Sequence, residues 1–309
     1  MEGEINKEGK DRLFCFIFGR AENKAWTLEL YNAVNGTEYT NPDDVEITTM
    51  EDYIYMGMKN DVSFIIDSDI SLYEHQSSFN PNMPVRQLMY LGRQYDKYIK
   101  ETRQNIYGKK QMVLPVPRLV TFYNGIDDVP DRILKLSDSF SKGKNAEKSD
   151  VEVTVHMYNI RPQYKNAIIK MCKPLEEYSW FIEKVREYRK SLEIVEAVDH
   201  AIADMPKEFG IRSFLKLHQT EVRNMCITEY DEADTMQMFK EEGREEGRYF
   251  HLISQICRKL RKGKTVEQIA DELEEDEARV KAICDAAEEF APDYDEEKVM
   301  TAAGAGAFV

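Results

Sequence analysis

Two neighbouring runs of strand-forming residues, VSFII and ISLYEHQ, carry acidic and amide side chains at their ends. Asp61 comes directly before the first run, and Glu74 and Gln76 close the second. Two carboxylates brought together repel each other, and a hard divalent cation between them removes that cost. Magnesium takes oxygen ligands and is usually held by one or two carboxylates together with a substrate phosphate. The residue types therefore indicate metal-assisted hydrolysis of a phosphodiester.

A β-hairpin would bring these side chains to one face of a sheet. If Ser68 and Asp69 form a two-residue turn, antiparallel pairing predicts Asp67 opposite Ile70, Ile65 opposite Leu72, Ser63 opposite Glu74, and Asp61 opposite Gln76. Asp61 and Glu74 are then diagonal neighbours at roughly 5 to 8 Å, near enough to share a cation. The other face is mainly apolar and is expected in the core: Val62, Phe64, Ile66, Ser71, Tyr73 and His75. The alternative is a solvated sheet face on which the polar residues do no chemistry.

The elements that would position this hairpin follow an α/β order. Residues 22–35 have helical periodicity, and Gly36 is placed to end that helix. A helix of about six turns begins at Pro84 and stops at Gly108. Strands are predicted at 116–123 and 151–158 from β-branched content and alternation. From about residue 164 the pattern is helical, so we expect an α/β core over 1–163 and a helical extension over 164–240.

The helix that begins at Pro84 has two chemically different sides. Its predicted apolar stripe consists of Leu88, Leu91, Tyr95 and Ile99. Its predicted basic side consists of Arg86, Tyr90, Arg93, Lys97 and Lys100. Arginine contacts to phosphate would hold a DNA backbone beside the metal, and Arg86 and Tyr90 follow the EHQ strand most closely. The alternative is a solvated amphipathic face, above all for Lys97 and Lys100.

Residues 241–290 are predicted to form a helical tail. Thr265 and Gln268 make a capping box, and a break near Asp276 separates two short helices. That joint permits a helix-turn-helix interpretation, but the segment ADELEEDEARV is acidic where a DNA-reading helix should be basic. We therefore expect the tail to pack or to self-associate, which would give a homo-oligomer. Residues 291–309 end in TAAGAGAFV and are expected to be disordered.

Composition limits the partners and the compartment. The net charge of −15 opposes nucleic-acid binding, although residues 241–300 alone contribute −8. The five cysteines include no CxxC pair, so neither a disulfide framework nor a thiolate zinc site is indicated. The polar N-terminus and the short apolar run LFCFIF fit neither a signal peptide nor a membrane span. We expect a cytoplasmic protein without a membrane partner.

One segment resembles a known family. The stretch ISLYEHQSSFNPNMPVRQLMYL, with Asp61 upstream and LPVPRLVTFYNG downstream, closely resembles the Rpn family of recombination-promoting, transposase-like nucleases. That family belongs to the PD-(D/E)XK nuclease superfamily, and the similarity is strongest over residues 60–125. The resemblance implies a restriction-endonuclease-like core, with a central mixed sheet flanked by helices, and a mainly helical C-terminal portion. It also implies DNA as partner and Mg²⁺ as cofactor, with Mn²⁺ as a substitute.

The resemblance also implies roles for individual residues. Asp61 would stand for the motif aspartate, Glu74 for the second acid, and the His75 backbone carbonyl for a third metal ligand. Gln76 occupies the position that is usually lysine, and a neutral amide cannot stabilise transition-state charge as an ammonium does. Asn60 replaces a proline that is often absent. Two further candidates are Ser63 and Glu29, the latter because related nucleases use a first-helix glutamate; its alternative is a surface glutamate.

Two functions stay open at this point. In the first, the protein is a metal-dependent DNA endonuclease associated with recombination or mobile elements. Asp61 and Glu74 bind the metal, Gln76 orients water or phosphate, and Arg86 with Tyr90 supports the substrate. In the second, the protein is a catalytically weak or inactive nuclease fold that acts as a DNA- or protein-binding module. The glutamine at the lysine position and the net acidity motivate this second function.

Overall fold

The computed structural model describes residues 13–49, 62–141 and 149–304, with side chains for all of these except 231–243, 246 and 304. The chain divides into two compact units, Met1–Ala233 and Asp234–Val309. The first unit contains the sheet together with the helical segment from residue 164, which therefore packs with the predicted core.

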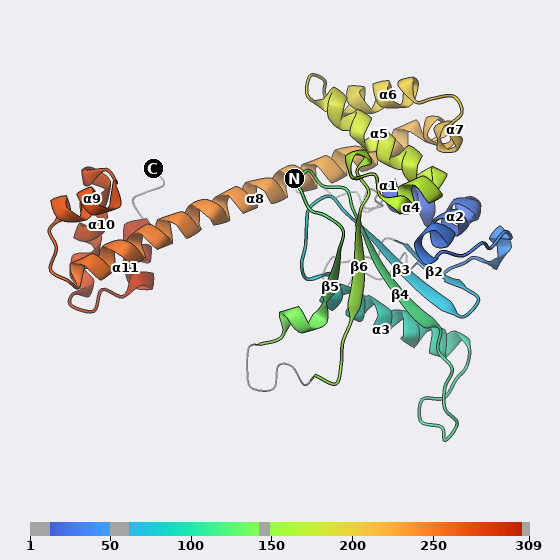
Figure 1. The fold of residues 1–309 in the computed structure, drawn as a ribbon, viewed down its shortest axis with the longest axis horizontal. Coiled ribbons are helices and arrows are strands. Elements are labelled where there is room, and N and C mark those ends of the chain that lie inside the picture. The colour runs from blue at the N-terminus through green and yellow to red at the C-terminus, as the bar shows by residue number, and fades with distance from the viewer. Residues whose placement is uncertain (1–12, 50–61, 142–148, 305–309) are drawn as a thin grey trace, which may run out of the picture. The chain divides into compact units, whose positions relative to one another are not determined.

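The first unit is built on a six-stranded mixed sheet with strand order β1-β2-β3-β4-β6-β5 (Figure 1). Its strands are β1 (Glu46–Ile47), β2 (Val62–Ile66), β3 (Asp69–Gln76), β4 (Val116–Tyr123), β5 (Arg132–Lys135) and β6 (Thr154–Asn159). The central strands β3, β4 and β6 are parallel, and the remaining pairs are antiparallel. The strand predicted at 116–123 is confirmed, and the one predicted at 151–158 begins three residues later than expected. The α/β class is confirmed.

The β2–β3 hairpin has a different turn from the predicted one. Asp67 and Ser68 form the turn, and Asp67 adopts a φ of 52°. Ser63 therefore lies opposite Leu72, not opposite Glu74. The shift occurs because aspartate tolerates the left-handed conformation, which frees Asp69 to begin β3. There the Asp69 carboxylate accepts hydrogen bonds from the Tyr31 hydroxyl at 3.0 Å and from Arg118 Nε at 2.8 Å.

Helices cover both faces of the sheet (Figure 1). Those of the first unit are α1 (Leu13–Phe18), α2 (Lys24–Asn35), α3 (Met83–Glu101), α4 (Ala167–Met171), α5 (Lys173–Arg189), α6 (Ile194–Asp204) and α7 (Gly210–Leu217). The long helix α8 (Gln219–Leu260) begins in this unit. Short 3₁₀ turns occur at Ala21–Asn23, Pro42–Asp44, Leu136–Ser139, Pro162–Tyr164 and Glu288–Phe290. Gly36 ends α2 with a φ of 66°, as predicted.

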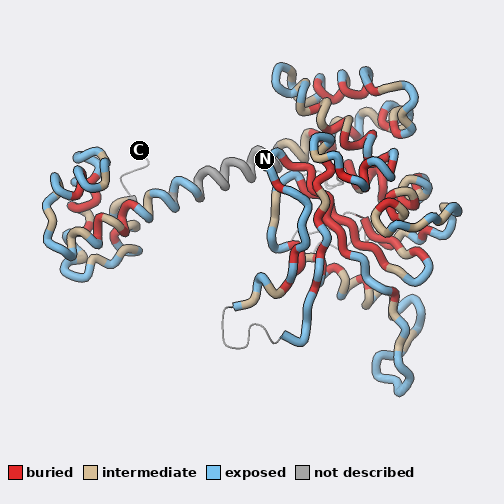
Figure 2. Tube along the Cα trace, viewed as in Figure 1, coloured by how far each residue is buried: buried red, intermediate tan, exposed pale blue. Residues whose placement is uncertain are grey.

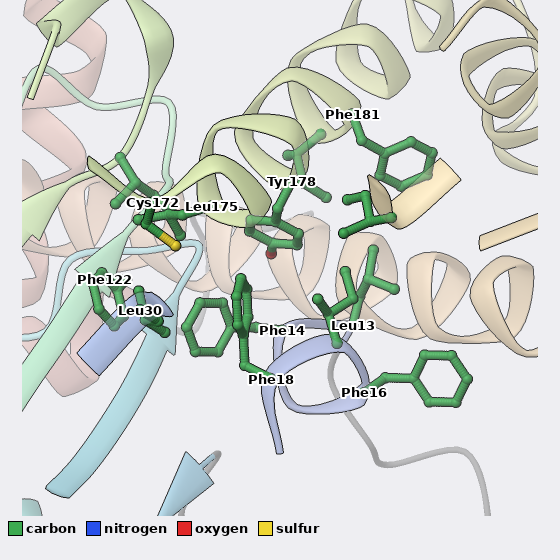
Figure 3. Close-up of a cluster of buried hydrophobic side chains, with 14 of the residues drawn as sticks. Leu13, Phe14, Phe16, Phe18, Leu30, Phe122, Cys172, Leu175, Tyr178 and Phe181 are labelled. Carbon is green, nitrogen blue, oxygen red and sulfur yellow. The ribbon is translucent and has the colours of Figure 1, made fainter. Parts of the chain in front are cut away.

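The larger core lies between the sheet and the helices α1, α2 and α4–α7. It includes the inward side chains of β2 and β3 predicted for the core, among them Val62, Phe64 and Tyr73. Aromatic side chains of α1 fill its centre, where Phe14 packs against Phe122 with ring centroids 5.2 Å apart (Figure 3). The run LFCFIF is thus a buried helix, since five of its six residues are inaccessible to solvent.

The opposite face of the sheet is also buried (Figure 2). Its core includes Ile70, Leu72, Leu119, Tyr123, Val155 and Met157 beneath α3. Glu74 is 0% exposed and Gln76 is 4% exposed, so the alternative of a solvated sheet face is wrong. The alternation itself was predicted correctly, because a shift of two residues in the pairing leaves the same side chains on the same face.

The side that helix α3 turns to the sheet agrees only in part with the predicted one, since Leu91 and Tyr95 of the predicted stripe pack against this core. The buried residues are Met83, Pro84, Gln87, Tyr90 and Gln94, while Leu88 is 37% exposed. Two amides explain this orientation. Gln87 Nε2 donates to the Val120 carbonyl at 3.2 Å, and Gln94 Nε2 donates to Ser63 Oγ at 2.8 Å. Because each buried amide nitrogen has an acceptor on the sheet, a stripe with two glutamines can face the core.

The second unit is a small helical bundle. The end of α8 packs with α9 (Val266–Leu273), α10 (Glu277–Ala287) and α11 (Glu296–Gly304). The Thr265–Gln268 capping box is confirmed. Two short helices meet near Asp276 as predicted, and their helix-turn-helix role stays a prediction. The expectation of disorder from residue 291 is wrong for α11, because Val299 is buried in the bundle core. No helix among the described residues has both the length and the hydropathy needed to cross a bilayer.

One ion cluster makes the second unit sensitive to acid. Hydrogen bonds from the ammonium groups of Lys259 and Lys264 hold the pKa of Glu272 at about 2, below its ordinary value of 4.5. A carboxyl group whose pKa is lower in the folded state than in the unfolded state stabilises the fold at pH values above the unfolded-state pKa. This stabilisation is lost as the pH falls through the folded-state pKa. We therefore expect amides of α9 to lose hydrogen-exchange protection between about pH 4.5 and pH 2. Glu272→Gln should flatten this dependence, and an unchanged profile would contradict it.

Candidate active site

The candidate site lies toward the carboxyl ends of the parallel strands β3 and β4. Glu74 is paired with Thr121 of β4, and Gln76 is paired with Tyr123. Because neighbouring residues of a sheet point to the same side, these four side chains share the face that α3 covers. The strands therefore bring one carboxylate, one amide and two hydroxyls together.

Glu74 forms a buried ion pair with α3. Arg86 Nη2 lies 3.2 Å from Glu74 Oε2 and also donates to the Tyr90 hydroxyl at 3.1 Å. The Glu74 side chain has no exposed surface, whereas that of Arg86 is 21% exposed. A buried carboxylate requires a compensating charge, and the guanidinium provides it from the edge of the helix. Glu74, the predicted metal ligand, and Arg86, the predicted phosphate contact, are thus in direct contact.

The side-chain oxygen of Gln76 is an unused hydrogen-bond acceptor among the described residues. Gln76 Nε2 donates to Met83 Sδ at 2.6 Å, while Gln76 Oε1 is buried and has no hydrogen-bond partner among the described residues. The neighbouring Thr121 Oγ1 is likewise buried without a partner in the described part of the chain. Buried polar atoms are nearly always hydrogen-bonded in folded proteins. Two such atoms on adjacent strands beside Glu74 are consistent with a place for water, a cation or a phosphate oxygen.

Three other predicted residues take up structural contacts. Ser63 Oγ accepts the hydrogen bond from Gln94 of α3. The His75 ring lies on the opposite face of the sheet, where Nε2 is 3.0 Å from the Tyr178 hydroxyl and the ring stacks on Phe14. Glu29 Oε1 accepts a hydrogen bond of 2.7 Å from the backbone N–H of Lys173, at the start of α5. Since α2 packs on the face opposite α3, the Glu29 carboxylate is held away from Glu74.

The predicted DNA-binding side of α3 is only partly accessible. Tyr90 is 4% exposed, so its prediction as a surface contact is wrong; the Gln87 and Gln94 bonds turn it toward the sheet. Arg93 and Lys97 are half-buried at the rim, and Lys97 Nζ donates to the Thr48 carbonyl at 3.4 Å. Lys100 is exposed, and its Nζ lies 2.6 Å from Asp96 Oδ2. The accessible cations therefore follow one edge of the helix.

Asp61, the other predicted metal ligand, lies outside the described residues. It directly precedes Val62, which pairs with Tyr73, the neighbour of Glu74 in β3. Within the described residues no group of three or more His, Cys, Asp and Glu side chains could hold a metal ion. The carboxylate, amide and hydroxyl oxygens of Glu74, Gln76 and Thr121 are the kind of ligand that Mg²⁺ takes, and the Met83 thioether beside them already accepts from Gln76 Nε2. One carboxylate of the described chain would take part.

Sequence reasoning missed several residues at this end of the sheet. Thr121 and Met83 gave no signal, because a strand threonine and a helix methionine are ordinary. Arg186 of α5 donates to Asn124 Oδ1 at 2.9 Å and also to the Asn124 carbonyl, which places a cation just beyond β4. Burial, and then the charge of Asp127, raises the pKa of Tyr123 to about 12. The Tyr123 hydroxyl therefore stays protonated at neutral pH and is no general base.

Comparison with models of protein families, with curated proteins and with solved structures found no match.

Proposed function

We propose that this protein is a metal-dependent DNA endonuclease. The observation that supports the proposal best is the buried row of Glu74, Gln76 and Thr121, in which two oxygen acceptors have no hydrogen-bond partner among the described residues. Glu74 and Asp61 would hold Mg²⁺, with the His75 carbonyl as a third ligand. When bound, Mg²⁺ supplies Lewis-acid polarisation of the phosphoryl group and lowers the pKa of water. Hydrolysis forms one P–O bond to water and breaks the one to the leaving oxygen, which takes up a proton.

The chain's own residues would perform three tasks in this reaction. Gln76 Oε1 would accept a hydrogen bond from the attacking water and orient it toward phosphorus. Arg86, whose side chain is 21% exposed, would contact a phosphate oxygen from the rim of α3 while its bonds to Glu74 and Tyr90 fix its direction. Arg93 and Lys97 would hold the backbone farther along the helix. The buried setting of Gln76 strengthens its hydrogen bond relative to one in water.

A second candidate is a nuclease fold that binds DNA or protein without cleaving it. The observation in its favour is the Glu74–Arg86 pair itself. The carboxylate already has its compensating charge at 3.2 Å, so the fold does not need a cation to bury it. The neutral Gln76 at the lysine position points the same way. In this function the Glu74 carboxylate serves to anchor α3.

The test is cleavage of plasmid and linear DNA by the purified full chain with Mg²⁺, Mn²⁺ or EDTA. We expect cleavage only with metal, and Asp61→Ala should abolish it because one anionic ligand is removed. Asp96→Ala, an exposed carboxylate on α3, is the matched control and should cleave normally. Equal rates for Asp61→Ala and wild type would overturn the site assignment.

Thermal unfolding separates the two candidates without any substrate. A metal that binds only the folded state raises its stability by about 2.7 kcal/mol at a concentration of 100 Kd. We expect millimolar Mn²⁺ to raise the Tm of the wild type and to leave that of Asp61→Ala unchanged. A wild type with no shift would favour the non-catalytic candidate.

A further inference from the structure

The loop that joins α3 to β4 differs in charge from the rest of the chain. Residues 102–115, the 102–115 loop, read TRQNIYGKKQMVLP and contain three cationic residues and no acidic one. Together with α3, residues 83–115 hold seven Lys and Arg against two Asp and Glu, a net of +5 in a chain of −15. The rest of the chain is therefore strongly acidic as a whole, although the short run RKLRKGK at 258–264 is also basic.

Hydrogen bonds give the loop a defined shape. Helix α3 ends with Arg103 in the left-handed conformation at a φ of 52°, and the Gln104 N–H donates to the Ile99 carbonyl at 3.1 Å. The Gln104 side chain then exchanges two hydrogen bonds of 3.0 Å with the backbone of Val113, and these bonds hold the two ends of the loop together. At the tip, the Gly108 N–H donates to the Asn105 carbonyl at 3.0 Å. The residues at the tip, 105–110, are therefore held on a base fixed by hydrogen bonds.

Large apolar side chains stand in solvent at this tip. Tyr107 is 95% exposed and Ile106 is 62% exposed. Lys109 and Lys110 follow directly and are also exposed. No ion pair engages Arg103, Lys109 or Lys110 within the parts of the chain whose side chains are described. An exposed aromatic ring among uncompensated cations is the combination that binds single-stranded nucleic acid.

The position of the loop relates it to the candidate active site. The loop leads into Val116, which pairs with Asp69 at the start of β3. Glu74 lies five residues after Asp69 in the same strand, which is a distance of about 17 Å at 3.3 Å per residue. Helix α3 covers this distance, since 19 residues span about 28 Å. Its rim carries Arg86, Arg93 and Lys97 between the site and the loop. These cations form a line, which fits a linear polyanion better than a planar membrane surface.

We propose that the 102–115 loop binds an unpaired DNA strand, with one base stacked on Tyr107 and phosphates on Arg103, Lys109 and Lys110. The proposal deepens the proposed function and rests on it for the choice of DNA. A ring can stack only on an accessible base face, and within a duplex the neighbouring base pairs cover those faces. The loop therefore selects DNA with a single-stranded segment next to the site of cleavage.

The test measures binding of the full chain to a fluorescent 30-nucleotide oligo(dT) and to a 30-base-pair duplex in EDTA, where no cleavage occurs. Tyr107→Ala should weaken oligo(dT) binding about tenfold and duplex binding less than about twofold. The double variant Lys109→Ala/Lys110→Ala should weaken both and lower the salt slope for oligo(dT) by about 1.4. Arg103→Gly removes a charge at a position whose positive φ favours glycine, so weaker binding by this variant is expected to come from the lost charge.

The matched control is Lys207→Ala/Lys216→Ala/Leu217→Ala, which removes two exposed lysines and a 79% exposed leucine from the helical extension. It should bind both DNAs like the wild type. An unchanged oligo(dT) affinity for Tyr107→Ala would overturn the proposal, as would binding to phosphatidylserine vesicles that depends on Tyr107 while DNA binding does not. If Tyr107→Ala loses oligo(dT) binding but the wild type never cleaves DNA, the result would support the loop proposal and contradict the nuclease proposal. If the wild type cleaves DNA and Tyr107→Ala binds oligo(dT) as the wild type does, the result would support the nuclease proposal and contradict the loop proposal.

Discussion

Replacement of Glu74 by alanine should lower the free energy of unfolding of the first unit by about 3 to 5 kcal/mol. The reason is the setting of the ion pair with Arg86. The Glu74 carboxylate has no exposed surface, and the guanidinium 3.2 Å away is largely buried. Removal of the acid leaves a cation at the edge of the core without this counter-charge, and the desolvation of the guanidinium is no longer offset. Urea unfolding followed by circular dichroism measures the effect.

A second variant distinguishes this explanation from simple loss of volume. Glu74→Leu/Arg86→Met replaces both charges by apolar groups and should recover most of the lost stability. In a nuclease, both variants would be inactive, whereas Glu74→Gln would keep the shape and lose the metal. A cost below about 1 kcal/mol for Glu74→Ala would mean that the carboxylate is hydrated in solution and would contradict its burial.

Gly125→Ala should destabilise the first unit by about 3 kcal/mol, at the upper end of overpacking effects. Gly125 follows the end of β4 and lies against the segment after Gln76. A Cβ at this position would overlap the carbonyl oxygen of Ser77 and the Tyr123 hydroxyl. The Ser77 oxygen belongs to the backbone, so relief requires β3 and β4 to separate where the Asn124 N–H donates to the Gln76 carbonyl at 2.8 Å.

The same substitution should reduce any nuclease activity about a hundredfold, because displacement by about 1 Å misplaces Gln76 against phosphorus. Gly92→Ala is the matched control. Gly92 is exposed on α3 with nothing within 4 Å of an added Cβ, so alanine should stabilise the protein by about 0.5 to 1 kcal/mol. Equal stability of Gly125→Ala and wild type would show that the strand ends yield at little cost.

Local chemistry made several elements predictable. The β4 strand, the Gly36 helix end and the Thr265–Gln268 capping box follow from residues that are neighbours in sequence. The short strands β1 and β5 were missed, because two and four residues carry too little alternation to be recognised. The buried side of α3 was predicted only in part, at Leu91 and Tyr95. Its stripe contains Gln87 and Gln94, and a hydrophobic pattern cannot reveal amides whose partners come from distant strands.

The sequence by itself determined which side chains of β2 and β3 share a face, since alternation depends only on backbone geometry and survives the shift in pairing. It also determined that an acid, an amide and an arginine lie close in the chain. Only the tertiary structure decided that Glu74 is fully buried against Arg86, that Gln76 meets Met83, and that Tyr107 stands in solvent. These outcomes depend on contacts between segments far apart in sequence, whose packing is selected by the whole core and not by any local pattern.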